Sequence, residues 1–172
     1  VLPGKKHITA LRLEVLPDPR LPSNGPGRAP NGNFYLNEIR LLTAPVDSKA
    51  KPKRVPFKGA VADFSQDGSP VGQAIDNNND TGWAIAPEAG KAHTAVFAVQ
   101  GTVGAEAGVE LTVEIFQQLV FKEHNIGRFR LSVTTAKNPL KNRELPDAIS
   151  AALAVPAEQP KVAKKEVEMA EQ

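Results

Sequence analysis

The 172-residue sequence contains no cysteine and only one tryptophan, one tyrosine and one methionine. Without cysteine, disulfide bonds and thiolate metal sites are excluded, and the cell compartment cannot be read from redox chemistry. Basic residues number 21 and acidic residues 19, so charge gives no reason to expect nucleic-acid binding. The apolar runs are too short to cross a bilayer, and we expect no membrane insertion.

The chain begins at Val1 and shows no signal peptide, so we expect a processed or excised piece of a larger protein. Its length suits one domain with an appendage. The 15 prolines and 13 glycines favour a loop-rich β protein over a helical one.

Several short segments alternate apolar and polar residues, which is the period of a half-buried strand. A register change in the second segment would turn Phe34, Leu36 and Ile39 inward. Between the segments, 17–33 and 45–58 are predicted as long loops, the latter with a basic docking strip as the alternative. These features favour an antiparallel β-sandwich. The predicted strands cover 8–16, 34–42, 61–64, 94–99, 109–117 and 129–134, with one helical turn at 71–75.

The composition changes towards the C-terminus. A short helix is predicted at 146–153, with Pro146 at its start, and 164–170 is rich in lysine and glutamate. We therefore expect a β-sandwich module over 1–144 and a helical linker or tail over 145–172.

A run of oxygen-bearing side chains ends at the single tryptophan, Trp83. Calcium takes six to eight oxygen ligands, and Asp76, Asn78, Asp80 and Thr81 can supply several of them. An EF-hand is excluded, because its spacing and closing glutamate are missing. The alternative is a turn rich in Asn and Asp that holds no metal. For Trp83 we favour a core position, with its N–H bonded to a backbone carbonyl, over an exposed platform for sugars.

No constellation of catalytic residues is evident. There is no cysteine nucleophile and no Gly-x-Ser-x-Gly motif. His93 and His124 flank predicted strands and could meet at one end of a sandwich, where Glu123 would complete a titratable cluster. We nevertheless expect no enzyme, and solvated loop histidines are the simpler interpretation.

Two short patterns resemble discoidin-type modules, which are jelly-roll β-sandwiches of the galactose-binding-like superfamily. Ala74, Asp76, Thr81 and Trp83, preceded by Ala62 and Ser65, resemble the opening of such modules, and 34–41 resembles their closing strand. Here the closing strand comes first, so either the order is circularly permuted or the chain is cut from a larger arrangement. The resemblance implies a structural calcium held by Asp76, Asn78, Thr81, a backbone carbonyl near Ala74 and the distant Glu38.

A longer resemblance covers most of the chain. The segments 8–18, 25–34, 62–66, 81–85 and 127–134 are similar to a region of large planctomycete proteins that carry c-type cytochrome domains. The haem motif Cys-x-x-Cys-His is absent from this chain, so no haem is implied for it.

These features together predict a non-catalytic carbohydrate-binding module in a larger extracytoplasmic protein. Arginine and asparagine suit paired hydrogen bonds to vicinal hydroxyls or sulfate on a glycan or polysaccharide. The alternative is a structural domain that packs against neighbouring domains of a cytochrome-associated protein. The candidate ligand-binding residues are Arg20, Asn24, Arg28 and Asn31 in the long loop, with His93 and His124.

Overall fold

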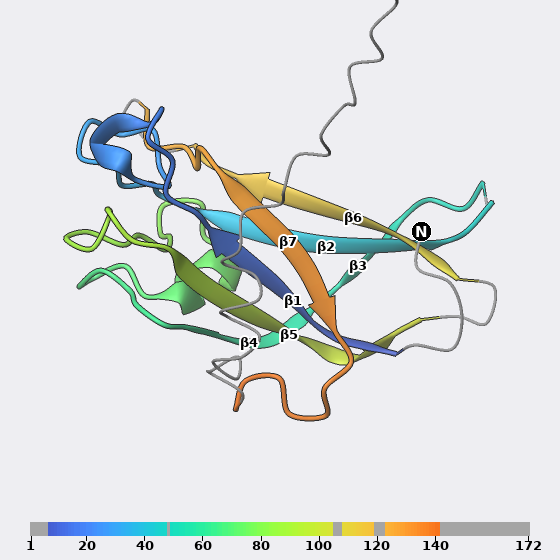
Figure 1. The fold of residues 1–172 in the computed structure, drawn as a ribbon. Helices are drawn as coiled ribbons and strands as arrows, with labels where there is room; N and C mark the ends of the chain where they lie inside the picture. The colour runs from blue at the N-terminus through green and yellow to red at the C-terminus, as the bar shows by residue number, and fades with distance from the viewer. Residues whose placement is uncertain (1–6, 48, 105–107, 119–122, 142–172) are drawn as a thin grey trace, which may run out of the picture.

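The computed structural model describes residues 7–47, 49–104, 108–118 and 123–141, and these form an all-β fold (Figure 1). The only helical elements in these ranges are two short 3₁₀ turns, η1 (Pro22–Asn24) and η2 (Val71–Ile75). The strands are β1 (Ile8–Val15), β2 (Glu38–Pro45), β3 (Lys53–Val55), β4 (Phe57–Ala62), β5 (His93–Val103), β6 (Val109–Phe116) and β7 (Phe129–Thr134).

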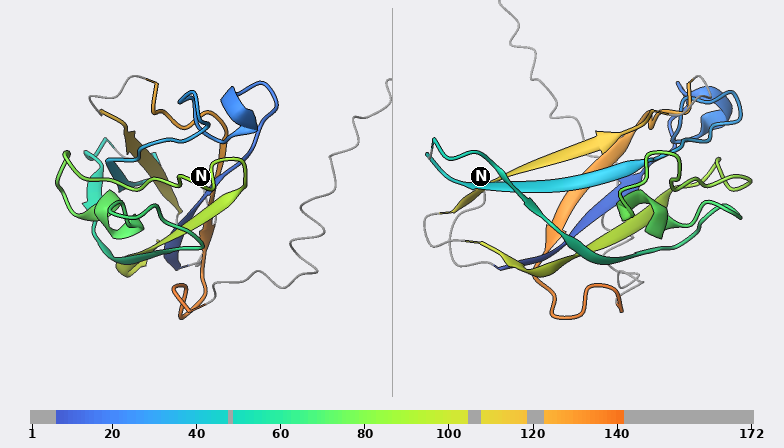
Figure 2. Two further views of the ribbon diagram at one scale, coloured as in Figure 1. Left: turned by 90° about the vertical axis from the view of Figure 1, so that its left-hand side faces the viewer. Right: turned by 180° about the vertical axis from the view of Figure 1, so that it is seen from behind.

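The strands form two antiparallel sheets that face each other as a sandwich (Figure 2). One sheet has the order β4-β5-β1-β7 and the other the order β3-β2-β6. Every strand pair is antiparallel, as expected from the alternating sequence pattern. The predicted antiparallel β-sandwich is therefore confirmed.

Inward-facing and outward-facing side chains alternate along β1, so this strand contributes to both the core and the surface. Leu11, Leu13 and Val15 are buried between the sheets, whereas the intervening side chains lie on the outer face. There Glu14 accepts two hydrogen bonds from Arg130 of the neighbouring strand β7, each at 2.8 Å. Opposite charges on directly paired residues support the register between these strands.

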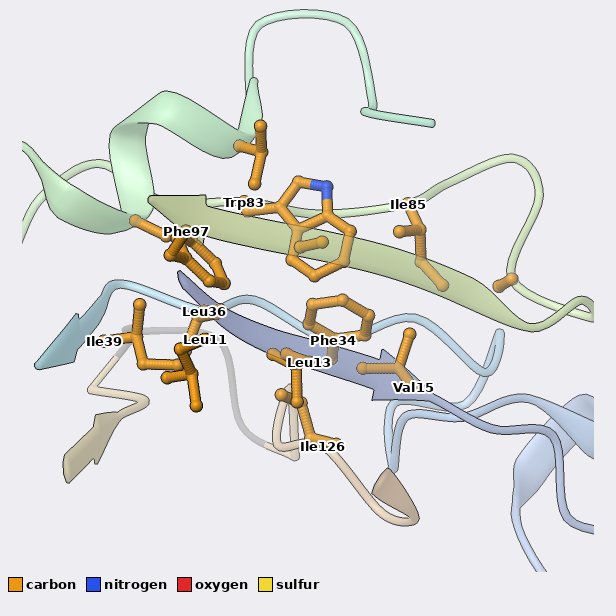
Figure 3. Close-up of a cluster of buried hydrophobic side chains, with 14 residues drawn as sticks. Leu11, Leu13, Val15, Phe34, Leu36, Ile39, Trp83, Ile85, Phe97 and Ile126 are labelled. Carbon is orange, nitrogen blue, oxygen red and sulfur yellow. The ribbon is translucent and has the colours of Figure 1, made fainter. Parts of the chain in front are cut away.

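Trp83 is fully buried in the core, as the sequence predicts. Its ring meets Phe34 edge-on, with the ring centroids 5.1 Å apart (Figure 3). The indole N–H donates to the carbonyl of Phe64 at 3.0 Å, so the one polar atom of the side chain is satisfied. Phe34, Leu36 and Ile39 are also fully buried, which confirms the inward positions expected for them.

The prediction of a loop over 45–58 was wrong in part, because this segment contains β3 and the start of β4. Lys53 and Arg54 are exposed on β3, an edge strand, and only Val55 is buried. Charged residues are typical of edge strands, because they discourage pairing with other chains. The basic residues and prolines of this segment led to the prediction of a loop, although the segment contains a strand.

The second strand starts later than predicted, at Glu38 rather than residue 34. Before it, Leu36 pairs with Trp83 as an isolated bridge, so the buried residues Phe34 and Leu36 belong to a loop that crosses the core. The predicted helix and tail over 145–172 lie outside the described residues. Within the described ranges, no helix is long and apolar enough to cross a membrane.

Replacing the tryptophan tests its role in the core. We expect Trp83→Phe to lower the free energy of unfolding by about 2 kcal/mol or more, because it leaves a cavity and an unpaired carbonyl at Phe64. Urea unfolding followed by circular dichroism measures this without the lost fluorophore. Phe129→Leu is the control, since Phe129 is 45% exposed and should change stability by much less. An equal loss in the two variants would contradict the assigned role.

Candidate functional site

Three connecting segments meet at one end of the sandwich. Val15, at the end of β1, pairs with His93 at the start of β5 and with Phe129 at the start of β7. The loops next to these residues therefore leave from the same end, which faces the viewer in the left panel of Figure 2. We call it the loop end.

The predicted long loop over 17–33 is tied down by its own backbone and by the segment before β7. Gly27 donates to the carbonyl of Gly32 at 3.0 Å, and Arg28 donates to that of Asn125 at 2.8 Å. Gly127 donates in turn to the carbonyl of Pro26 at 2.7 Å. At Gly27 an added Cβ would collide with the backbone of Asn33, so this close approach requires glycine. The loop therefore presents its side chains from a fixed backbone.

An open hollow of about 420 Å³ lies between these two segments. On one wall Arg20 holds the carboxylate of Asp18 in a two-pronged contact, with Nε and Nη2 at 2.9 and 2.8 Å. Nη1 of Arg128 lies 3.8 Å from Oδ2 of Asp18 and donates a hydrogen bond to the carbonyl of Pro17 at 3.2 Å. The hollow is lined by Asp18, Arg20, Leu21, Arg28, Gly127 and Arg128.

Positive charge exceeds negative charge in this hollow, since three guanidinium groups line it with one carboxylate. Asp18 is buried, and the hydrogen bonds from Arg20 hold the pKa of its carboxyl far below the ordinary 3.8. Arg28 is exposed, and among the described residues its side chain has no hydrogen bond or ion pair. Among the described residues, the hollow thus holds one cation, Arg28, without a counter-charge.

The structure brings only Arg20 and Arg28 of the predicted ligand-binding residues to this hollow. Asn24 is exposed in the turn of η1, and the side chain of Asn31 accepts from the backbone N–H of Asn33 at 3.1 Å. His124 is half-buried, and its backbone carbonyl accepts from Tyr35 at 2.8 Å. Neither asparagine nor His124 lines the hollow.

Sequence reasoning missed Asp18 and Arg128 as site residues. Arg128 lies 95 positions after the last residue of the loop, and the antiparallel pairing of β1 with β7 brings the two segments together. The signal that existed was a charged residue immediately before a predicted strand. This signal points to a site residue only when the strand order is known, because the strand order decides which loop lies next to Arg128.

The expectation that His93 is a solvated loop residue was wrong. His93 is the first residue of β5 and is only 2% exposed. Nδ1 lies 3.1 Å from a carboxylate oxygen of Asp63, and Nε2 lies 3.0 Å from the carbonyl of Glu88. Both ring nitrogens are thus engaged within the fold. In the alternative of an enzyme, His93 would join His124 and Glu123, but its ring nitrogens bond to Asp63 and to the carbonyl of Glu88 instead.

The loop that follows η2 closes on itself through short polar side chains. One carboxylate oxygen of Asp76 accepts from the backbone of Asn78 at 2.8 Å, and the other accepts from the Thr81 hydroxyl at 2.7 Å. The side chain of Asn78 accepts from the backbone of Asp80 at 3.1 Å. These contacts form an Asn- and Asp-rich turn, as the metal-free interpretation of the sequence requires.

Two consecutive residues of the β2 segment hold this loop against the sheet. Asn37 is fully buried and donates to the carbonyl of Asn79 at 2.7 Å. Glu38 is fully buried, and its Oε1 accepts from the backbone N–H of Asn77 at 2.6 Å. The structure therefore brings Glu38 to the Asp76 loop across 38 positions of sequence. It adds Asn37, which sequence reasoning had not selected.

The second carboxylate oxygen of Glu38, Oε2, is buried and has no hydrogen-bond partner in the part of the chain that the structure describes. Arg40 and Arg54 approach it at 3.7 and 3.8 Å, outside hydrogen-bond distance. Burial raises the pKa of Glu38 and outweighs the hydrogen bond from Asn77 and the nearby arginines, and the charge of Asp76 adds to the rise. A buried carboxylate oxygen without a hydrogen bond, beside a second carboxylate, is a position that a further cation would stabilise.

The donor set at this position fits a hard cation in type but contains few charges. Among the residues the structure describes, no group of three or more His, Cys, Asp or Glu side chains gathers. The predicted ligands are two carboxylates, on Asp76 and Glu38, together with neutral oxygens of Asn78, Thr81 and the backbone near Ala74. Oxygen ligands of this kind are what calcium prefers.

The pair of His93 and Asp63 predicts how stability depends on pH. Burial lowers the pKa of His93, but the hydrogen bonds to Asp63 and to the carbonyl of Glu88 outweigh it and raise the pKa above 6.5. Similarly, burial raises the pKa of Asp63, but the bonds from His93 and Thr94 bring it below 3.8. The contribution of His93 is complete below pH 6.5 and is lost as pH rises through its folded pKa, whereas that of Asp63 is lost in acid.

We therefore expect the free energy of unfolding to fall as pH rises from about 6 to 9. In Asp63→Asn the carboxylate that raises the pKa of His93 is gone, so this fall should be smaller. Asp67→Asn, which changes an exposed aspartate without a bonded partner among the described residues, should keep the wild-type slope. Urea unfolding at several pH values measures the slopes, and equal slopes in all three proteins would refute the pairing.

Comparison of the chain with protein-family models, with curated proteins and with solved structures found no match. The candidate sites therefore rest on their own geometry. Two arrangements stand out: the arginine-lined hollow at the loop end and the buried Glu38 beside the Asp76 loop.

Proposed function

We propose that this chain is a non-catalytic carbohydrate-binding module of the jelly-roll, galactose-binding-like kind. It works as one part of a larger extracytoplasmic protein and binds a glycan at the loop end. The observation that carries the proposal is the open hollow lined by Arg20, Arg28 and Arg128. Guanidinium groups form paired hydrogen bonds with neighbouring oxygen atoms, which saccharides present in abundance.

The rigidity of the loop end supports binding without large rearrangement. Gly27, Arg28 and Gly127 are held by backbone hydrogen bonds that join the long loop to the segment before β7. A fixed backbone reduces the entropy lost when a ligand is bound. The buried carboxylate of Asp18 also fixes Arg20, because it accepts hydrogen bonds from both the backbone N–H of Arg20, at 2.9 Å, and the Arg20 guanidinium.

Binding without catalysis is supported by how the titratable side chains are used. His93, the most buried histidine described, bonds to Asp63 and Glu88 and leaves no ring nitrogen for proton transfer to a ligand. In the hollow, the only carboxylate is Asp18, which Arg20 keeps ionised and paired. A hydrolase of glycosidic bonds ordinarily needs two carboxyl groups.

We also propose that the Asp76 loop holds a structural calcium ion. Asp76 and Glu38 would supply charged oxygens, with Asn78, Thr81 and a backbone carbonyl near Ala74 as neutral ligands. The Oε2 atom of Glu38 supports this assignment, because it is buried and has no hydrogen-bond partner among the described residues. Arg40 and Arg54 offset part of the same charge and are the competing explanation for how Glu38 is stabilised.

A structural domain that packs against neighbouring domains would have a different surface. Such a role favours a broad apolar patch on the isolated fold. Of the large hydrophobic side chains in the described ranges, only Phe129 is exposed. The surface at these residues therefore favours glycan binding over domain packing.

Removal of calcium tests the proposed metal site. If the ion binds the folded state, a chelator should lower the melting temperature by several degrees, and added calcium should restore it. Asp76→Ala should melt at or below the temperature of the chelated wild type, because it also loses the hydrogen bonds from Asn78 and Thr81, and it should respond to neither treatment. Asp67→Asn should keep the full response. A wild-type protein whose melting temperature ignores both chelator and calcium would show that the loop is a plain turn.

A glycan array and affinity electrophoresis test the proposed function itself. We expect retention on at least one polysaccharide. In Asp18→Asn, Arg20 loses its charged anchor and retention should weaken about tenfold, because a bond between charged groups is removed. Asp67→Asn should bind as the wild type does. No retention on any neutral or acidic polysaccharide would count decisively against a carbohydrate-binding module.

A further inference from the structure

The charge of Arg28 points to the class of saccharide that the hollow takes. Its guanidinium lines the hollow and, within the described residues, has neither a hydrogen bond nor an ion pair. The two other arginines share one carboxylate, that of Asp18. A neutral saccharide would offer hydroxyl oxygens to these groups but would leave the excess positive charge without a counter-charge.

We propose that the hollow binds the carboxylate or sulfate group of an acidic saccharide, with Arg28 and Arg128 as the residues that contact it. This inference rests on the proposed carbohydrate-binding function and names the ligand class for the same site. Arg128 donates one bond to Pro17 through Nη1, and no described contact uses its Nε or Nη2. Planar guanidinium groups match carboxylate and sulfate oxygens in pairs.

Asp18 acts as a positioning residue for this contact. It binds Nε and Nη2 of Arg20 and lies 3.8 Å from Arg128, so it holds both cations at the wall of the hollow. One carboxylate cannot neutralise three arginines. Asp18 therefore positions the arginines, and the hollow keeps a net positive charge that a ligand can contact.

The location of the hollow distinguishes it from the basic segment near β3. Exposed lysines at 49, 51 and 53 lie around the connection between β2 and β3, at the end of the sandwich opposite the 17–33 loop (Figure 1). A nucleic acid that bound by charge alone would favour the segment with more basic residues. Arg28, by contrast, is a single cation in a concave and rigid setting, which suits one anionic group on a saccharide.

Titration calorimetry with chemically matched ligands tests the inference. Oligogalacturonate is compared with its methyl ester, in which the carboxylates are masked, and carrageenan oligosaccharides are compared with their desulfated form. We expect the wild type to bind at least one acidic ligand about tenfold more tightly than its masked partner at ~0.15 M salt. The pair that shows the difference identifies carboxylate or sulfate.

Two variants with the same charge change locate the binding. Arg28→Gln should weaken binding of the acidic ligand by about tenfold and leave binding of the masked ligand unchanged. Lys58→Gln removes an exposed charge on β4, at the opposite edge of the sheet from β7, and should bind as the wild type does. Both residues are exposed, and circular dichroism confirms that the variants are folded.

Several outcomes would overturn the inference. Equal affinity for acidic and masked ligands would refute it while leaving the carbohydrate-binding function intact. Equal losses in Arg28→Gln and Lys58→Gln would show general charge attraction instead of a site. Binding to vesicles that contain phosphatidylserine, with no binding to acidic saccharides, would assign the hollow to a lipid headgroup. No binding to any saccharide would refute both the inference and the proposed function.

Discussion

Leu36 and Trp83 exchange two backbone hydrogen bonds, each at 2.9 Å, in the middle of the core. This bridge joins the segment before β2 to the segment after the Asp76 loop, and the Trp83 ring packs on Phe34 beside it. Because the bridge fixes both segments, Asn37 and Glu38 come to lie against the loop over 77–79. The candidate metal site therefore depends on a contact made by apolar core residues.

The same core segment connects to the loop end. Asn33, two positions before Tyr35, accepts from the backbone of Ile85 at 3.0 Å and donates to Gln66 at 3.1 Å. One buried asparagine thus ties the long loop to the chain that follows Trp83. Buried polar networks of this kind contribute to a single backbone arrangement when every member is paired. Two arginines of the hollow, Arg20 and Arg28, lie on the loop that this network holds in place.

The two sites use burial in opposite ways. Glu38 is a fully buried carboxylate whose Oε2 has no hydrogen-bond partner, and burial raises its pKa. Asp18 is also buried, but Arg20 surrounds it with hydrogen bonds and lowers its pKa. The first arrangement favours a further positive group, whereas the second presents spare positive charge to the solvent. This difference is the reason for proposing a structural role at Glu38 and ligand recognition at the hollow beside Asp18.

Local sequence pattern was sufficient where burial alternates along the chain. The alternation in β1, β6 and β7 predicted those strands, and the apolar setting of Trp83 predicted its place in the core. The loop rich in proline and glycine over 17–33 was also evident. Pattern failed at β3, where exposed Lys53 and Arg54 lie on an edge strand that buries only Val55. Edge strands carry little alternation, because much of their surface faces water.

What the sequence alone determined was the class of fold and the identity of the polar loops, since both follow from residue types and their spacing. Only the tertiary structure decided which loops meet. Arg28 and Arg128 face one hollow because β1 pairs with β7, and His93 is withdrawn into a pair with Asp63. Contacts between residues far apart in sequence depend on strand order, and strand order is selected by the packing of the whole core.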